Sequence, residues 1–315
     1  MLGVRFGLVA AAGEIVPKTF FNVVSYAGTG SAGNVVTGVG FSPDLGWLQA
    51  SATLYSLICT DTTFMGIGKI FLEATAGVAS ENGPSSFDAN GFTLGAGTHK
   101  AYYNASSTTY YAMNFKKTSG AFDIVSYTGN GTNPRNISHN LGVVPEMIIL
   151  LAPDTGNTYV YHKSAGNTKK IIWDSVGADS TDSNAWNNTT PTSSIFTVGS
   201  TFNANTGHYI ALLFATSSGN SSVGSYTGNG SATGPTVSLD FQPQFVIINT
   251  PGYDWVGINS AQNPSNPRTA WSAANGDGGT LSGGVDFNAS SFQIKDTAAN
   301  VNTNGATYRY LAVGS

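Results

Sequence analysis

Charged side chains are scarce in this chain of 315 residues: Asp, Glu, Lys and Arg make up 10%, whereas about a quarter is usual. With 13 Lys and Arg residues and a net charge of −4, the composition argues against a nucleic-acid partner, which requires a basic face. Solubility must come from Ser, Thr, Asn and Gly, which hydrogen-bond water and favour turns and strands over helix.

Cysteine and long hydrophobic runs are also nearly absent. Cys59 is the only cysteine, so no intrachain disulfide can form, and we expect it to be a buried strand residue. This is compatible with assembly in a reducing cytoplasm and with later exposure outside a cell. No stretch approaches 18 apolar residues, so we expect no membrane span, and the apolar start is too short and Gly-interrupted for a cleaved signal peptide.

Residues that usually carry catalysis or bind metals are few. The four histidines show no metal-ligand spacing. Asp174, Asp179 and Asp182 share a Ser/Gly-rich loop, where carboxylates could serve glycoside hydrolysis or bind Ca²⁺, but a solvated polar loop is the preferred interpretation. We therefore expect no enzymatic activity, no metal site and no cofactor.

The most informative feature is a phrase that occurs three times. It reads Ser-Tyr-Ala-Gly-Thr-Gly at 25–30 and Ser-Tyr-Thr-Gly-Asn-Gly at 126–131 and 225–230, so the copies begin 101 and then 99 residues apart. Further landmarks recur in the same order at nearly the same spacing: Pro43, Pro145 and Pro243; Phe71, Trp173 and Trp271; and strand-like runs that begin at Tyr110, Tyr209 and Tyr308. A repeated module is typical of proteins that present surfaces rather than enclose one catalytic pocket.

The sequence predicts an all-β fold of three tandem antiparallel β-sandwich modules, at 21–119, 120–219 and 220–315, after a short N-terminal arm at 1–20. Short β-rich apolar runs separated by turn formers support this prediction. Residues 143–151 should form a central strand, with 209–214 beside it. The joints are short, so we expect a stiff rod or a compact cluster. The arm either anchors the subunit in a neighbour or pairs within module 1, and both alternatives stay open.

The second module resembles a repeated module of tailed-bacteriophage structural proteins, especially tail-fibre-like proteins. The resemblance covers nearly all of residues 124–216 and lies in the runs 126–132, 137–149, 160–163, 185–199 and 209–215. The third module keeps only the frame and lacks the Ser-His-Asn-Leu-Gly phrase of 138–142, and the first has diverged further. The resemblance implies an external, oligomeric virion component and supplies no catalytic residues.

Aromatic residues suggest where a ligand could bind. Trp173 and Trp271 share a repeat position, so we expect both in the core. Trp186 instead lies in a polar loop with Asn184 and Asn187, and an exposed indole beside amides suits stacking on a sugar. These three residues and His162, at a strand end, are the candidate glycan contacts. A structural role for Trp186 and an inert one for His162 are the alternatives.

The leading functional expectation is a structural virion protein of a tailed bacteriophage: a tail-fibre or tail-tip subunit that presents surfaces for host attachment. The alternatives are a head-fibre or capsid-decoration protein and a bacterial carbohydrate-binding adhesin array. The expected partners are other copies of the chain in a homotrimer, other virion proteins through residues 1–20, and a host surface glycan. The expected location is the virion, after assembly in the host cytoplasm.

Overall fold

The computed structural model describes residues 19–50, 53–59, 69–72, 77–80, 83–154, 157–173, 176–273 and 278–314. Strand accounts for 48% of the structure and helix for 4%, and every strand pairing is antiparallel, which confirms the all-β prediction. The predicted N-terminal arm, residues 1–20, falls largely on residues 1–18, which lie outside the described residues. No helix in the described ranges is long and apolar enough to cross a membrane.

The strands fall into three consecutive segments, each of which pairs only within itself in the described part of the chain. The first segment contains β1 (Phe21–Ala27), β2 (Asn34–Thr37), β3 (Leu45–Ala50), β4 (Thr53–Cys59), β5 (Lys69–Leu72), β6 (Gly77–Ser80), β7 (Pro84–Asp88), β8 (Gly91–Leu94) and β9 (Thr109–Phe115). The second contains β10 (Phe122–Thr128), β11 (Arg135–Ser138), β12 (Met147–Ala152), β13 (Asn157–His162), β14 (Lys169–Ile172), β15 (Ser180–Thr181), β16 (Ile195–Val198) and β17 (His208–Phe214).

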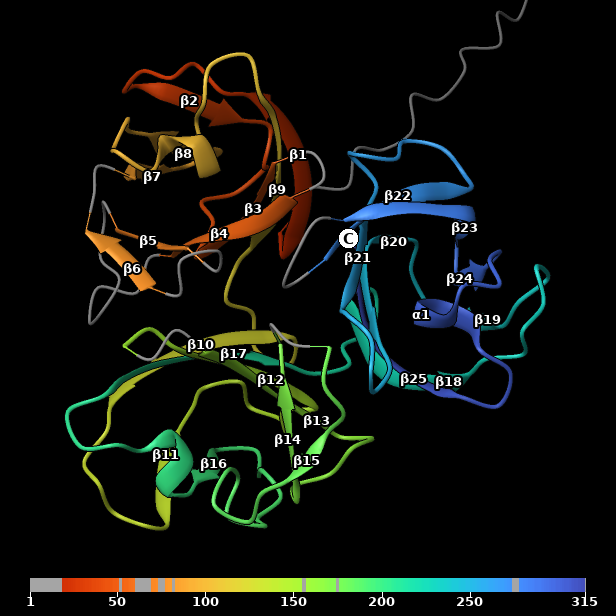
Figure 1. The fold of residues 1–315 in the computed structure, drawn as a ribbon. Coiled ribbons are helices and arrows are strands. Elements are labelled where there is room, and N and C mark those ends of the chain that lie inside the picture. The colour runs from red at the N-terminus through yellow and green to blue at the C-terminus, as the bar shows by residue number, and fades with distance from the viewer. Residues whose placement is uncertain are drawn as a thin grey trace, which may run out of the picture.

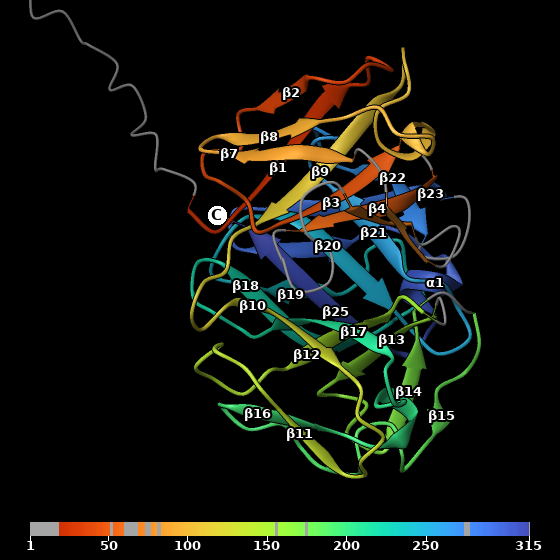
Figure 2. The ribbon, with the colours of Figure 1, turned by 90° about the vertical axis from the view of Figure 1, so that its left-hand side faces the viewer.

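The third segment contains β18 (Ser221–Thr227), β19 (Thr236–Ser238), β20 (Pro243–Asn249), β21 (Val256–Asn259), β22 (Arg268–Ala273), β23 (Gly279–Asn288), β24 (Ser291–Ile294), the short helix α1 (Ala299–Asn302) and β25 (Thr307–Gly314). The main sheets have the orders β1-β9-β3-β4-β5-β6, β10-β17-β12-β13-β14-β15 and β18-β25-β20-β21-β22-β23-β24-β19. Each thus begins with the first strand of its segment, then the last, then the third. Smaller sheets β2-β8-β7 and β11-β16 lie outermost, at opposite ends of the molecule (Figures 1 and 2).

The registers of the three main sheets agree at the landmark prolines. Leu45, Met147 and Phe245 each stand two residues after such a proline, and they pair with Phe115, Phe214 and Val313 of the last strand. β12 lies between β13 and β17, which confirms a central strand with 209–214 as its neighbour. The strand begins at Met147 and not at 143 as predicted, because Val143 and Val144 are exposed in the preceding loop.

The repeated phrase closes each segment through the same contacts. In the second segment the Tyr127 hydroxyl donates to the carbonyl of Phe202 (2.8 Å), and the Tyr127 ring stacks on Tyr209 at 4.9 Å. The buried Asn203 side chain accepts from the Asn130 amide (3.1 Å) and donates to the carbonyl of Thr132 (2.7 Å). The counterparts are Tyr26 and Asn104 in the first segment and Tyr226 and Asn302 in the third, with the same bonds.

Glycine is required in the phrase for two reasons. A Cβ on Gly129 would overlap the carbonyl oxygen of Ala204, so only glycine lets the two backbones approach. Gly131 has a φ of +73°, in the left-handed region that favours glycine. The phrase therefore recurs because each copy presses the same backbone turn onto the same buried asparagine.

The three main sheets share one central core. Each turns one face toward a core of its own segment and the other toward a common cluster to which all three segments contribute. At its centre the Trp173 ring lies 5.2 Å from Trp47 and 4.8 Å from Trp255, and Trp47 meets Phe245 at 5.9 Å. Burial on both faces explains why all six residues of β12 are apolar and buried. The structure is therefore a compact cluster with three lobes around one core, and not a rod (Figure 1).

Polar contacts also cross between the segments. Asp179 binds Arg309 through two bonds of 2.8 and 2.9 Å, and Arg309 is 4% exposed. Asn259 donates to the side chain of Gln49 (3.0 Å), which itself donates to Gln262 (3.0 Å). Buried, directional bonds of this kind set how the sheets are oriented on the shared core.

The landmark spacing was misleading for one set of aromatics. In the second segment Ile172 pairs with Tyr159, and in the third Ala273 pairs with Val256 at the equivalent position. Trp173 stands one residue after Ile172, whereas Trp271 stands two residues before Ala273. Equal spacing along the chain does not give equal register here, because the loop between β21 and β22 is longer than that between β13 and β14. Trp173 is 1% exposed, as predicted, but Trp271 is only half-buried, so that part of the prediction is wrong.

Candidate functional site

The loop predicted to contact glycan does not offer an exposed indole. Trp186 is 1% exposed and packs between Tyr161 (5.7 Å) and Phe202 (4.9 Å) in the core of the second segment. Asn187 has a φ of +49°, so the chain turns sharply after the indole enters the core. Asn184 is exposed and Asn187 half-buried, but they flank no exposed aromatic ring in this loop. The expectation of an exposed Trp186 is corrected, because burying a large aromatic ring outweighs the polarity of its neighbours.

His162 is buried as well, which corrects its interpretation as a surface contact. It is 0% exposed at the seam between the second and third segments, with Nε2 3.3 Å from the carbonyl oxygen of Tyr310. Its Nδ1 accepts from the backbone amide of Ser164 at 3.2 Å. Burial lowers the pKa of His162 to about 4, so the ring is neutral at pH 7.

The acidic loop is occupied by structural contacts. Asp179 pairs with Arg309, and Asp182 lies 3.2 Å from the ammonium of Lys170. Asp174 lies outside the described residues. Within the ranges that the structure describes, no three His, Cys, Asp or Glu side chains are grouped closely enough to hold a metal ion.

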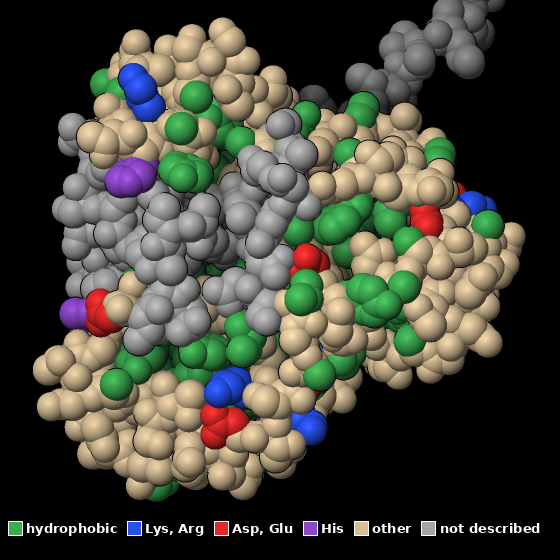
Figure 3. All heavy atoms as spheres, in the orientation of Figure 1, with side chains coloured by type: hydrophobic (Ala, Val, Ile, Leu, Met, Phe, Trp, Pro, Cys, Tyr) green, Lys and Arg blue, Asp and Glu red, His purple; other side chains and the backbone are tan. Residues whose placement is uncertain are grey.

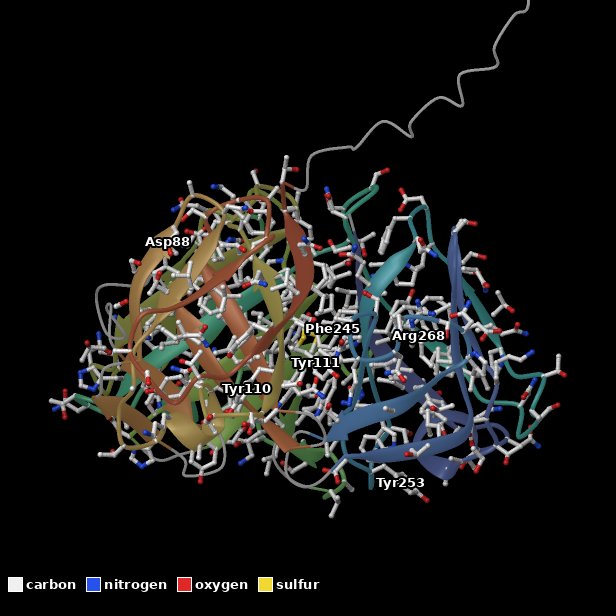
Figure 4. All side chains as sticks on the ribbon, turned by 90° about the horizontal axis from the view of Figure 1, so that it is seen from above. Asp88, Tyr110, Tyr111, Phe245, Tyr253 and Arg268 are labelled. Atoms are coloured by element: carbon white, nitrogen blue, oxygen red, sulfur yellow. The ribbon has the colours of Figure 1, made fainter. Side chains whose placement is uncertain are left out.

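A hollow of about 330 Å³ between the third segment and Val176 of the second has the features that the Trp186 loop lacks. It is lined by two aromatic residues, a carboxylate, an amide and small or aliphatic residues: Tyr253, Trp271, Asp254, Asn300, Val176, Gly252 and Ala299. Tyr253 is 42% exposed and Val176 is 53% exposed. Hydrophobic side chains gather over this part of the surface, near β21 and α1 (Figure 3). Figure 4 shows Tyr253 at the outer edge of the molecule, whereas Phe245 lies where the sheets meet.

A loop, a strand and a short helix position these side chains. Tyr253 and Asp254 belong to the loop between β20 and β21, which is held by a bond from Asn249 to the Tyr253 carbonyl (3.0 Å). Trp271 lies on β22 and packs its inner side against the core of the third segment. Asn300 lies on α1, which is anchored because the Tyr308 hydroxyl donates to the Ala299 carbonyl (2.7 Å). The hollow is therefore built on fixed elements.

Two of the residues that line this hollow each carry an acceptor atom without a partner. Asp254 Oδ1 and Asn300 Oδ1 are buried, and neither has a hydrogen-bond partner in the described part of the chain. Burial raises the pKa of the Asp254 carboxyl, and no cation compensates it among the described residues. Two other hollows differ in this respect, since their carboxylates are paired: Glu146 with Lys163 (2.8 Å) and Asp179 with Arg309 (2.8 Å). The amide oxygens of Asn114, Gln244 and Asn249 are also buried without a partner, so the distinguishing feature of this hollow is the uncompensated Asp254 carboxylate beside two aromatic residues.

The sequence contained a signal for part of this architecture. Asn104, Asn203 and Asn302 are spaced by 99 and again 99 residues, and a search for repeated single positions would have found these buried hubs. Tyr253 and Asp254 belong to no repeated phrase, and no pattern along the chain marks them.

The chain belongs to the family described as "Domain of unknown function (DUF7483)", which matches residues 16–314. The match spans all three segments, so the family describes the whole cluster and not one segment. No curated protein matches the chain.

Proposed function

We propose that this chain is a structural protein of a tailed-bacteriophage particle, a tail-fibre or tail-tip subunit that presents surfaces for host attachment. In this proposal it consists of three β-sandwich modules, at 21–119, 120–219 and 220–315, of which the second resembles modules of such proteins. The modules share the strand order at the start of their main sheets, the register at the landmark prolines and the Tyr–Asn closure, and a unit that occurs three times around a common core makes a rigid body.

The shared core is the observation that carries the proposal. A chain that buries three tryptophans where its three sheets meet cannot separate its lobes without exposing them. Such a body resists hinge motion and presents its outer loops in a constant arrangement. This suits a particle component that must survive outside a cell better than it suits a flexible enzyme.

Immunoelectron microscopy of phage particles tests the proposal. Gold-labelled antibody against the purified chain should decorate the tail fibres or tail tip. Label on the capsid instead would move the protein to a head fibre or decoration role. If the particles carry no label and the chain is instead found on the surface of bacteria, the adhesin alternative replaces the proposal.

Self-association is a further part of the proposal. Residues 1–20 join the subunit to other virion proteins and help three copies to form a homotrimer. The described end of this arm supports a firm connection, since Phe20 is 1% exposed in the shared core and its carbonyl accepts from the Lys116 amide at 2.9 Å. A closed ring of identical rigid subunits is the usual form of such assemblies.

A further inference from the structure

The second segment serves as an internal control for the hollow around Trp271 and Asn300. Lys170 stands two residues before the paired Ile172, as Trp271 does before Ala273, and Thr201 precedes the buried Asn203 as Asn300 precedes Asn302. In the second segment these positions are closed by one carboxylate: Asp182 lies 3.2 Å from Lys170 and accepts from Thr201 at 3.1 Å.

The third segment leaves the same place open. An indole replaces the ammonium, and an amide with an unpartnered oxygen replaces the hydroxyl. Asp254 adds an unpartnered carboxylate oxygen from the neighbouring loop, and Tyr253 adds a second, exposed aromatic ring. The contrast within one chain indicates that the open site is specific to this segment and not a general consequence of the fold.

The chemistry of the lining restricts the ligand. The carboxylate of Asp254 and the amide of Asn300 suit a ligand that donates hydrogen bonds, and two aromatic side chains suit one with an apolar face. A pyranose sugar has both, since its hydroxyls donate and its C–H face stacks on aromatic rings. A carboxylate without a cation further favours a sugar that carries a protonated amine and disfavours one that carries an acid.

We propose that the hollow lined by Tyr253, Trp271, Asp254 and Asn300 binds one pyranose ring of a surface glycan, an amino sugar better than a neutral one. This deepens the proposed function and rests on it only for the source of the sugar, the host surface. The sugar ring lies against the aromatic side chains and donates its hydrogen bonds to Asp254 and Asn300.

Ligand-observed saturation-transfer NMR on the full chain, titrated separately with glucosamine, glucose and glucuronic acid, tests the inference. Glucosamine should bind most tightly and glucuronic acid least. Tyr253→Ala should weaken binding of glucosamine about tenfold through loss of the exposed ring. Asp254→Asn should remove the preference for glucosamine over glucose, because the amide carries no charge. Thr201→Ala, which alters the position in the second segment equivalent to Asn300, should leave all three affinities unchanged.

A thermal melt of each variant checks that it is folded. Tyr253→Ala should disturb folding least, because the Tyr253 side chain is exposed. The inference is overturned if no sugar gives saturable binding, or if binding is unchanged in both Tyr253→Ala and Asp254→Asn. Neither result affects the gold-labelling experiment, so failure of the sugar site and failure of the virion assignment remain distinguishable.

Discussion

Lowering the pH should lower the free energy of unfolding through the protonation of one side chain. That side chain is His162, which lies at the seam between the second and third segments. Its ring is 0% exposed, and burial lowers its pKa from 6.5 to about 4. The unfolded chain holds this imidazole in water at its ordinary pKa of about 6.5, so between these values the unfolded state binds the proton and the folded state does not. Stability is therefore complete above pH 6.5, falls as the pH drops toward 4, and levels off below. At pH 5 the loss amounts to about 2 kcal/mol.

Urea unfolding of the wild type and of His162→Asn, from pH 7.5 to pH 4.5, measures this loss. Asparagine is the matched choice, because Asn259 occupies the equivalent end of β21 and bonds Gln49 across another seam. Both proteins titrate the same carboxylates, so these cancel in the difference between the two free energies of unfolding. The wild type should lose about 2 kcal/mol more than the variant between pH 7.5 and pH 5. Parallel curves would refute the reasoning and show that His162 is hydrated in the folded protein.

Three more predictions follow from the packing. Gly129→Ala should lower the free energy of unfolding in urea by about 3 kcal/mol or more, because the new methyl overlaps the Ala204 carbonyl. Gly219→Ala, at a φ of +73° with open space around it, should lower it by about 1 kcal/mol. Equal losses would contradict the argument from close backbone approach. Trp173→Ala should lower the free energy of unfolding by about 3–5 kcal/mol and broaden or split the unfolding transition. An unchanged thermal melt would show that Trp173 does not contribute to the core. Deleting residues 2–18, which spares the buried Phe20, should leave the melt intact and reduce the mass in solution from trimer to monomer; a full chain that is monomeric would disprove the trimer.

Much of the secondary structure could be predicted from the sequence, because strands and turns have local causes. The apolar run of β12, the final strand β17 and the turns of the repeated phrase lie where the residues predict them. The landmark prolines occupy equivalent registers for the same reason, since each stands two residues before the apolar residue of a central strand that pairs with the last strand. The candidate sugar site could not be predicted in this way: Trp186 looks exposed along the chain and is buried in the fold.

What the sequence by itself determined is therefore the all-β character and the repeated closure of Tyr, Gly and Asn, which depend on neighbours in the chain and on one spacing of about 99 residues. Only the tertiary structure decided that the sheets meet on one core, that Trp173 lies at its centre, and that Trp271 faces a hollow beside Asp254. The physical reason is that an apolar strand face carries no mark of which other face will cover it. That choice depends on the packing of residues from all three segments and on buried bonds such as Asp179 to Arg309, which the order of residues along the chain does not reveal.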